Sequence, residues 1–176
     1  MSKEEQVIQQ IVAKFPFLEG KLTNPYDRRI HAEPLYKEDF EKVLDWLATE
    51  GGFDTFHLVI GFDSGENLEF VYVLSNADKI ILNVKQYAPK SNPVINSVVK
   101  YYKNCIWHER ELIDLFGATV EGLPEGPHYP LPDGWPEGQY PMRKDWKVEY
   151  FDKNTMTYNP PAPEAKEETP EAPAEN

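Results

Sequence analysis

The sequence of 176 residues contains 18 lysines and arginines against 30 aspartates and glutamates, a formal net charge of −12. So acidic a chain is repelled by nucleic-acid phosphates and anionic lipid head groups, which argues against both as direct partners. With 40% hydrophobic residues, the length suits one domain with a core plus extensions.

The sequence offers neither a membrane segment nor a cysteine pair. No apolar run approaches the roughly 20 residues of a membrane-spanning helix, and the N-terminus is typical of an acidic helix rather than a signal peptide. The single Cys105 leaves no pair for a disulfide, an iron–sulfur cluster or a structural zinc. We therefore expect a chain on the cytoplasmic side that holds no cofactor or metal, with Cys105 as a small buried hydrophobe.

Two amphipathic helices are expected near the N-terminus. A Ser-x-x-Glu capping box predicts a first helix over residues 2–14. Apolar residues at helical spacing predict a second helix over residues 36–47, which ends at Gly51-Gly52. Residues 28–34, between the two helices, are expected to be extended.

Three runs of β-branched and aromatic residues follow, at 53–62, 68–74 and 79–87, and predict an antiparallel meander. Strict alternation in the first run places Phe56, Leu58, Ile60 and Phe62 on one face and Thr55 and His57 on the other. The predicted fold class is α+β, with an antiparallel sheet, amphipathic helices packed on one face, and an extended Pro/Gly-rich C-terminal segment.

A third helix is predicted to begin at Asn92-Pro93, with asparagine as N-cap and proline at the first helical position. Its apolar stripe would comprise Val94, Ile95, Val98, Val99 and Tyr102. This helix would lead directly into the segment from Trp107 to Gly117.

The segment Trp107–Gly117 mixes ionisable and large apolar side chains over about three helical turns. At 100° per residue, Glu109 falls within the apolar arc, so its burial requires a partner, and Arg143, Lys144 or another protein are the candidate cations. Arg110 and Asp114, at i and i+4 on the other face, can pair with each other. The alternative is a local ion-pair network that only fixes a turn.

Residues 122–141 contain six prolines and four glycines, with aromatic residues between them. Such a composition forms no regular element, and its aromatic content suggests an extended segment that lies on another protein. The alternative is a loop folded back on its own domain. The sequence thus divides into a domain at 1–121, a partner-binding segment at 122–159, and an acidic Pro/Glu tail at 160–176 that is expected to be disordered.

Several motifs together resemble the signature of the 30-kDa subunit family of respiratory complex I. They are Glu109-Arg110-Glu111, Asp114-Leu115-Phe116-Gly117, Gly122-Leu123-Pro124, and Pro136-Glu137-Gly138 followed by Pro141-Met142-Arg143-Lys144-Asp145. The sequence is also similar to the counterpart subunit of archaeal energy-converting membrane-bound hydrogenases and related sulfur-reducing complexes. Gly122-Leu123-Pro124 stands where respiratory members usually have Gly-His-Pro, which favours this hydrogenase-like branch.

The resemblance implies a non-catalytic subunit without clusters in the peripheral arm of an ion-pumping redox complex. Its implied partners are the large catalytic subunit and the small iron–sulfur subunit, with ferredoxin as a donor. Glu109, Arg110, Glu111 and Asp114 would hold the turn at Gly117, while Arg143, Lys144 and Asp145 would bind the surface of the large subunit. Trp107, Phe116 and Pro141 complete this structural and partner-binding motif. The terminal electron acceptor would be chosen in that subunit.

Two other classes of function remain open from the residues alone. The chain could be a free-standing adaptor that docks an electron-carrier protein through its aromatic loop. It could also be a small enzyme that uses His108 with Glu109 or Glu111 as an acid–base pair.

Overall fold

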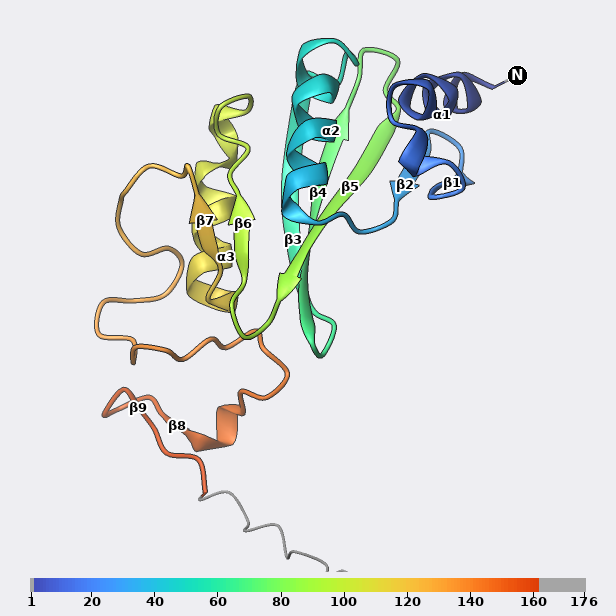
Figure 1. Cartoon of the computed structure of the whole chain (residues 1–176). Coiled ribbons are helices and arrows are strands. Elements are labelled where there is room, and N and C mark those ends of the chain that lie inside the picture. The colour runs from blue at the N-terminus through green and yellow to red at the C-terminus, as the bar shows by residue number, and fades with distance from the viewer. Residues whose placement is uncertain (1, 162–176) are drawn as a thin grey trace, which may run out of the picture.

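The computed structural model describes residues 2–161 and shows an α+β fold, as predicted (Figure 1). The helices are α1 (Lys3–Lys14), α2 (Lys37–Thr49) and α3 (Ile106–Phe116). The strands are β1 (Leu22–Tyr26), β2 (Arg29–Ala32), β3 (Thr55–Asp63), β4 (Asn67–Ser75), β5 (Ile81–Pro89), β6 (Val94–Asn96), β7 (Thr119–Glu121), β8 (Phe151–Asp152) and β9 (Thr157–Tyr158). Most of the acidic tail lies outside the described residues.

The main sheet has five strands in the order β1-β2-β5-β4-β3. The predicted antiparallel meander of β3, β4 and β5 is confirmed. The extended stretch at 28–34 contains β2, which pairs with β5 in parallel, and β1 completes a hairpin with it. β1 was not predicted, because its Asn24-Pro25 is atypical of a strand.

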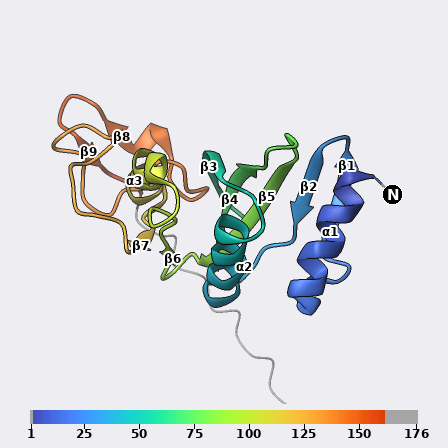
Figure 2. The ribbon, with the colours of Figure 1, turned by 90° about the horizontal axis from the view of Figure 1, so that it is seen from above.

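The helices cover one face of this sheet, as predicted. Figure 2 shows α1 and α2 side by side along that face, with α3 beyond β3 at the end nearer the C-terminal segment. α1 begins with the predicted capping box between Ser2 and Glu5. The rings of Phe40 on α2 and Phe116 on α3 contact Tyr72 and Phe70 of β4, so both helices share one core with the central strand.

The predicted side-chain alternation of β3 is wrong beyond its start. A bulge shifts the register between Phe56 and Leu58, so that Phe56 and Val59 are both buried. Leu58, Ile60 and Phe62 turn to the face opposite the helices and stay exposed. One extra residue in a strand moves every side chain that follows to the opposite face of the sheet, and no residue type in the sequence indicates such a bulge.

The predicted helix from Asn92 to Tyr102 is also wrong. Residues 94–96 form β6, which pairs in parallel with β7, about 25 residues later in the chain. Val94 and Ile95 are β-branched and favour a strand, and the distant partner strand decides between the two patterns.

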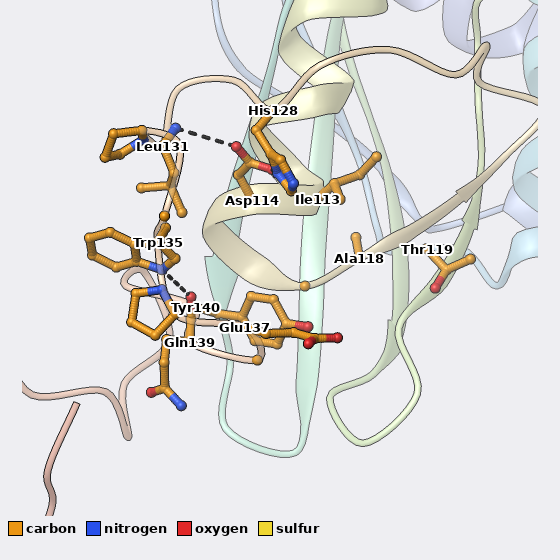
Figure 3. Close-up of a pocket in the computed structure, with 15 residues that line it drawn as sticks. Ile113, Asp114, Ala118, Thr119, His128, Leu131, Trp135, Glu137, Gln139 and Tyr140 are labelled. Atoms are coloured by element: carbon orange, nitrogen blue, oxygen red, sulfur yellow. Dashed lines mark hydrogen bonds and ion pairs between the residues drawn. The ribbon is translucent and has the colours of Figure 1, made fainter. Parts of the chain in front are cut away.

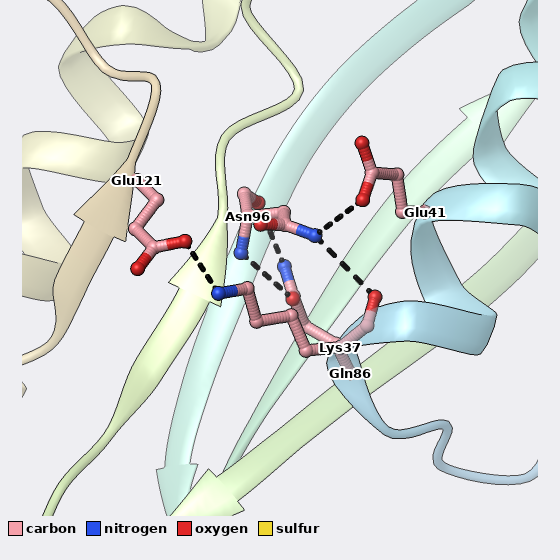
Figure 4. Close-up of polar contacts among 5 residues, drawn as sticks. All are labelled: Lys37, Glu41, Gln86, Asn96 and Glu121. Atoms are coloured by element: carbon pink, nitrogen blue, oxygen red, sulfur yellow. Dashed lines mark hydrogen bonds and ion pairs between the residues drawn. The ribbon is translucent and has the colours of Figure 1, made fainter.

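A polar junction joins the two sheets (Figure 4). The fully buried Gln86 of β5 donates to the carbonyl oxygen of Asn96 and accepts from its N–H, as a backbone partner would. The Asn96 amide donates to the Lys37 carbonyl and the Glu41 carboxylate of α2. Lys37 also forms an ion pair with Glu121 of β7, so the small sheet that leads to α3 has a fixed position.

Candidate functional site

Glu109 is fully buried between α3 and the sheet. Its carboxylate accepts hydrogen bonds from the Ser97 hydroxyl at 2.5 Å, the Val98 N–H at 2.8 Å and the Tyr72 hydroxyl at 3.3 Å. The prediction that Glu109 needs a cation is therefore wrong, because neutral donors from two other segments satisfy the carboxylate. Burial raises the pKa of Glu109, and these hydrogen bonds oppose the rise.

Arg110 fastens the C-terminal segment, residues 122–159, to α3. Its guanidinium donates to the carbonyl oxygens of Pro124 and Pro127, each at 3.0 Å. Gly126 lies against the same guanidinium so closely that a side chain at this position would displace it. The predicted pairing of Arg110 with Asp114 is wrong, because each residue binds the C-terminal segment instead.

Asp114 holds the next stretch of the segment. Its side chain accepts from the N–H of Tyr129 at 2.8 Å, the N–H of Leu131 at 3.3 Å and the His128 ring at 2.9 Å. The hydrogen bond to Asp114 and its charge raise the pKa of His128. Residues 124–131 therefore lie on their own domain, the alternative that the composition had left open.

The motif Pro141–Asp145 packs against the end of α3. Tyr140 covers Gly117, whose φ of +68° ends the helix, and leaves no room there for a side chain. The Met142 N–H donates to the Leu115 carbonyl at 3.1 Å, and Arg143 Nε donates to the Phe116 carbonyl at 2.7 Å. Arg143 also lies over the Tyr140 ring, 4.6 Å from its centroid. The motif thus satisfies helix-end carbonyl groups.

Asp63 and Lys90 connect this motif to the main sheet. Lys90 Nζ lies 2.6 Å from Asp63 and 2.8 Å from Asp145, and the N–H groups of Lys144 and Gly65 also donate to Asp63. Burial alone would raise the pKa of Asp63, but these donors and the ammonium hold it at about 2. Sequence reasoning missed both residues, because Asp63 ends β3 and Lys90 follows β5, and neither position has a sequence marker for so distant a partner.

A cavity of about 530 Å³ opens between the end of α3 and residues 128–140 (Figure 3). Ile113 and Ala118 form its back, Trp135 and Tyr140 its aromatic walls, and Glu137 its edge. The Trp135 indole N–H donates to the Gln139 carbonyl at 2.7 Å, which fixes the ring. Asp114, at one side of this cavity, already accepts the three hydrogen bonds that hold the segment.

Two exposed aromatic side chains meet beside α3, Trp107 of the helix and Tyr129 of the C-terminal segment. Trp107 is 53% exposed and Tyr129 is 44% exposed, with ring centroids 5.3 Å apart in an edge-on arrangement. Arg110 lies behind Trp107, 5.8 Å from its ring. Glu111 is half-buried on this helix, and His108 packs its ring against Phe56.

Residues 135–158 form a small aromatic cluster of their own. Trp146 stacks on Tyr158 at 5.4 Å, and Trp135 lies 4.7 Å from Phe151, whose strand pairs with β9. None of these rings is fully buried, and the Trp146 indole N–H has no acceptor among residues 2–161.

The described part of the chain holds no cluster suited to a metal ion. Among these residues, no three or more His, Cys, Asp or Glu side chains are grouped closely enough to ligate one. Cys105 is fully buried, as expected, and burial raises the pKa of its thiol. No helix within residues 2–161 has the length and apolarity to cross a bilayer.

Known proteins are similar to this chain in sequence and in fold. The family described as the respiratory-chain NADH dehydrogenase 30 Kd subunit matches residues 34–152. The chain belongs to this family. The match runs from α2 through the junction and α3 into the C-terminal segment, and it confirms the family expected from the motif residues.

Relatives lie among hydrogenase-type and related complexes. A subunit of the F(420)H(2) dehydrogenase of Methanosarcina mazei is 32% identical over 146 residues, 80% of this chain and 90% of that protein. The beta subunit of the membrane-bound hydrogenase of Pyrococcus furiosus is 30% identical over 152 residues, 84% of this chain and 88% of that protein. A chain of an archaeal membrane-bound sulfane sulfur reductase has the same fold, with a TM-score of 0.70 over 89% of this chain and 99% of that chain, at 23% identity.

Proposed function

We propose that this chain is a structural subunit, without clusters of its own, of a complex I-like or hydrogenase-related membrane complex. It braces the large catalytic subunit and the small iron–sulfur subunit in the peripheral arm, on the cytoplasmic side. One observation supports the proposal most directly. The side chains of Arg110, Asp114 and Arg143, which belong to the family's motifs, form hydrogen bonds that hold the C-terminal segment in place.

A preorganised segment suits partner binding because its ordering cost is met before the partner arrives. The fastening leaves Trp107 and Tyr129 exposed side by side, and both are residue types that dominate binding energy at interfaces.

The roles expected for Arg143, Lys144 and Asp145 change accordingly. Arg143 and Asp145 bind within the chain, to Phe116 and Lys90, so in this proposal they position the segment. Lys144 has an exposed side chain and donates through its backbone to Asp63, so it is the residue of the three that meets the partner directly.

The chemistry of the complex lies in its other subunits under this proposal. Electrons from a donor such as ferredoxin would pass through clusters in the partners. This chain would hold those subunits at the separation that electron transfer and ion pumping require. The terminal acceptor, whether protons, sulfur compounds or a quinone-like carrier, would be set by the large subunit.

Copurification tests the proposal. The tagged chain is isolated in mild detergent as wild type, as the Trp107→Ala/Tyr129→Ala double variant, and as Phe17→Ala, a control at an aromatic residue outside the segment that is 39% exposed. Loss of two interface aromatics, at about 2 kcal/mol each, should reduce recovery of the large and small subunits far more than tenfold. The control should recover both.

Equal recovery with the double variant would contradict the role of these two residues. A wild-type chain that binds an electron carrier but neither subunit would favour a free-standing adaptor. Iron analysis of the isolated chain adds a second readout, with a cluster content near zero expected.

A further inference from the structure

The bulge in β3 creates an apolar surface on the uncovered side of the sheet. Leu58, Ile60 and Phe62 are 36%, 47% and 39% exposed, and they lie in register beside β4. Leu58 pairs with Val73 and Ile60 with Val71, so the apolar strip continues onto β4, where Val73 is half-buried and Val71 is only 5% exposed. We call these five residues the open sheet face.

No described helix covers the open sheet face. Figure 2 shows α1 and α2 on the other side of the sheet, and the core residues of all three helices contact that other side. A sheet whose two faces are both apolar at the centre normally has other structural elements packed on both faces. Contiguous exposed apolar residues of this kind mark interaction sites.

Charge indicates the chemistry of the occupant. Val71 pairs with Lys85 of β5, and Arg29 of β2 pairs with Ile81, four residues before Lys85 on the same face of the sheet. Neither cation forms an ion pair with any described residue, although the chain has a net charge of −12. The carboxylate of Glu69, on the same face, accepts from the Ser64 hydroxyl. Lys85 beside the strip and Arg29 farther along the same face fit a partner that is apolar with an acidic flank.

Dimensions indicate the form of the occupant. From Leu58 to Phe62 the strand spans about 13 Å. An α-helix covers that length with about nine residues, little more than two turns. Addition of a strand to the edge of β3 is less suitable, because the Asn104 amide already donates to the Phe56 carbonyl at 3.0 Å.

We propose that the open sheet face binds an amphipathic helix of a partner subunit, whose apolar stripe lies along Leu58, Ile60 and Phe62 and whose acidic residues reach Lys85 and Arg29. This surface is separate from Trp107 and Tyr129, and the inference rests on the proposed function only in that the chain works within a complex. It would give the chain a second contact, on the opposite side of its sheet from the helices.

The first test uses Ile60→Glu in the tagged full chain. Because the side chain is exposed, the isolated variant should keep its fold and thermal midpoint, while recovery of at least one partner subunit in mild detergent falls at least tenfold. Lys85→Glu should reduce recovery less, and more at low salt than at high salt. Phe17→Glu, at an apolar residue that is 39% exposed and lies outside both proposed contacts, is the matched control and should recover the complex. Full recovery with Ile60→Glu overturns the proposal.

A photo-crosslinking amino acid at position 60 identifies the occupant. The expected product is a peptide of another subunit whose apolar residues recur every three or four positions, as on one face of a helix, with acidic residues beside that face. A cross-link to a second copy of the chain, to residues 162–176 or to lipid overturns the proposal, as does no cross-link. If the Trp107/Tyr129 variant loses the partner subunits while Ile60→Glu recovers them fully, the open-face proposal alone is overturned. If the wild-type chain recovers no partner subunit, both this proposal and the proposed function are overturned.

Discussion

The domain at residues 2–121 and the segment at 122–159 are ordered by different forces. The domain has one continuous core, in which side chains from three helices and the central strands are fully buried. The segment contributes almost nothing to that core. It is held by hydrogen bonds that Arg110 donates to it and that Asp114 and Asp63 accept from it. The first is expected to fold as one unit, and the second to detach locally at low cost.

This difference gives the ionisable motif on α3 two functions. Glu109 faces the sheet and belongs to the domain, whereas Arg110 and Asp114 face outward and belong to the segment. These contacts explain why one helix has both apolar and ionisable side chains. One side of α3 packs on the hydrophobic core, and the other side binds the C-terminal segment through hydrogen bonds.

The largest effect is expected from Glu109→Ala. The substitution leaves the Ser97, Val98 and Tyr72 donors unpaired in the core, so the free energy of unfolding should fall by about 3 kcal/mol or more. Chemical denaturation should show one cooperative transition at lower denaturant. The control is Glu111→Ala on the half-buried side of the same helix, and an equal loss in both variants would contradict the account.

Acid should next loosen the contact between sheet and segment. Because the pKa of Asp63 is lowered from 3.8 to about 2, its stabilising contribution is complete above about pH 4 and is lost as the pH falls toward 2. The shift corresponds to about 2 kcal/mol. Asp63→Asn should flatten the stability profile between pH 4 and 2, and an unchanged profile would show that the group does not control this contact.

Sequence patterns predicted the elements whose signals are local. The capping box of α1, the apolar spacing of α2 and the meander are all present as predicted. The failures depend on distant partners: β6 exists because β7 pairs with it, and Glu109 needs no cation because Ser97 and Tyr72 reach it. The motif residues were found from sequence, but their contacts could not be.

Asp114→Ala should affect the segment and spare the domain. Three hydrogen bonds to one carboxylate disappear, so exchange of the Tyr129 and Leu131 amide protons should accelerate at least tenfold, while the unfolding midpoint changes little. Glu125→Ala, an exposed residue of the same stretch, serves as the control. A large drop in the midpoint would mean that the segment and the domain form one cooperative unit.

The smallest effect is expected from His128. Its pKa is raised by Asp114, so the stabilising contribution of the protonated ring is complete below about pH 6.5 and fades as the pH rises through the raised pKa. Nuclear magnetic resonance titration of the ring should show this elevation, and Asp114→Ala should remove it. Identical titrations in both proteins would rule out the pair as its cause.

The central claim is that the C-terminal segment is ordered by its own chain but completed by a partner. Hydrogen–deuterium exchange of the free chain and of the chain within the purified complex tests it directly. The account predicts added protection in the complex around Trp107 and Tyr129, with the N-terminal helix α1 unchanged. Equal exchange in these regions in both states would contradict it.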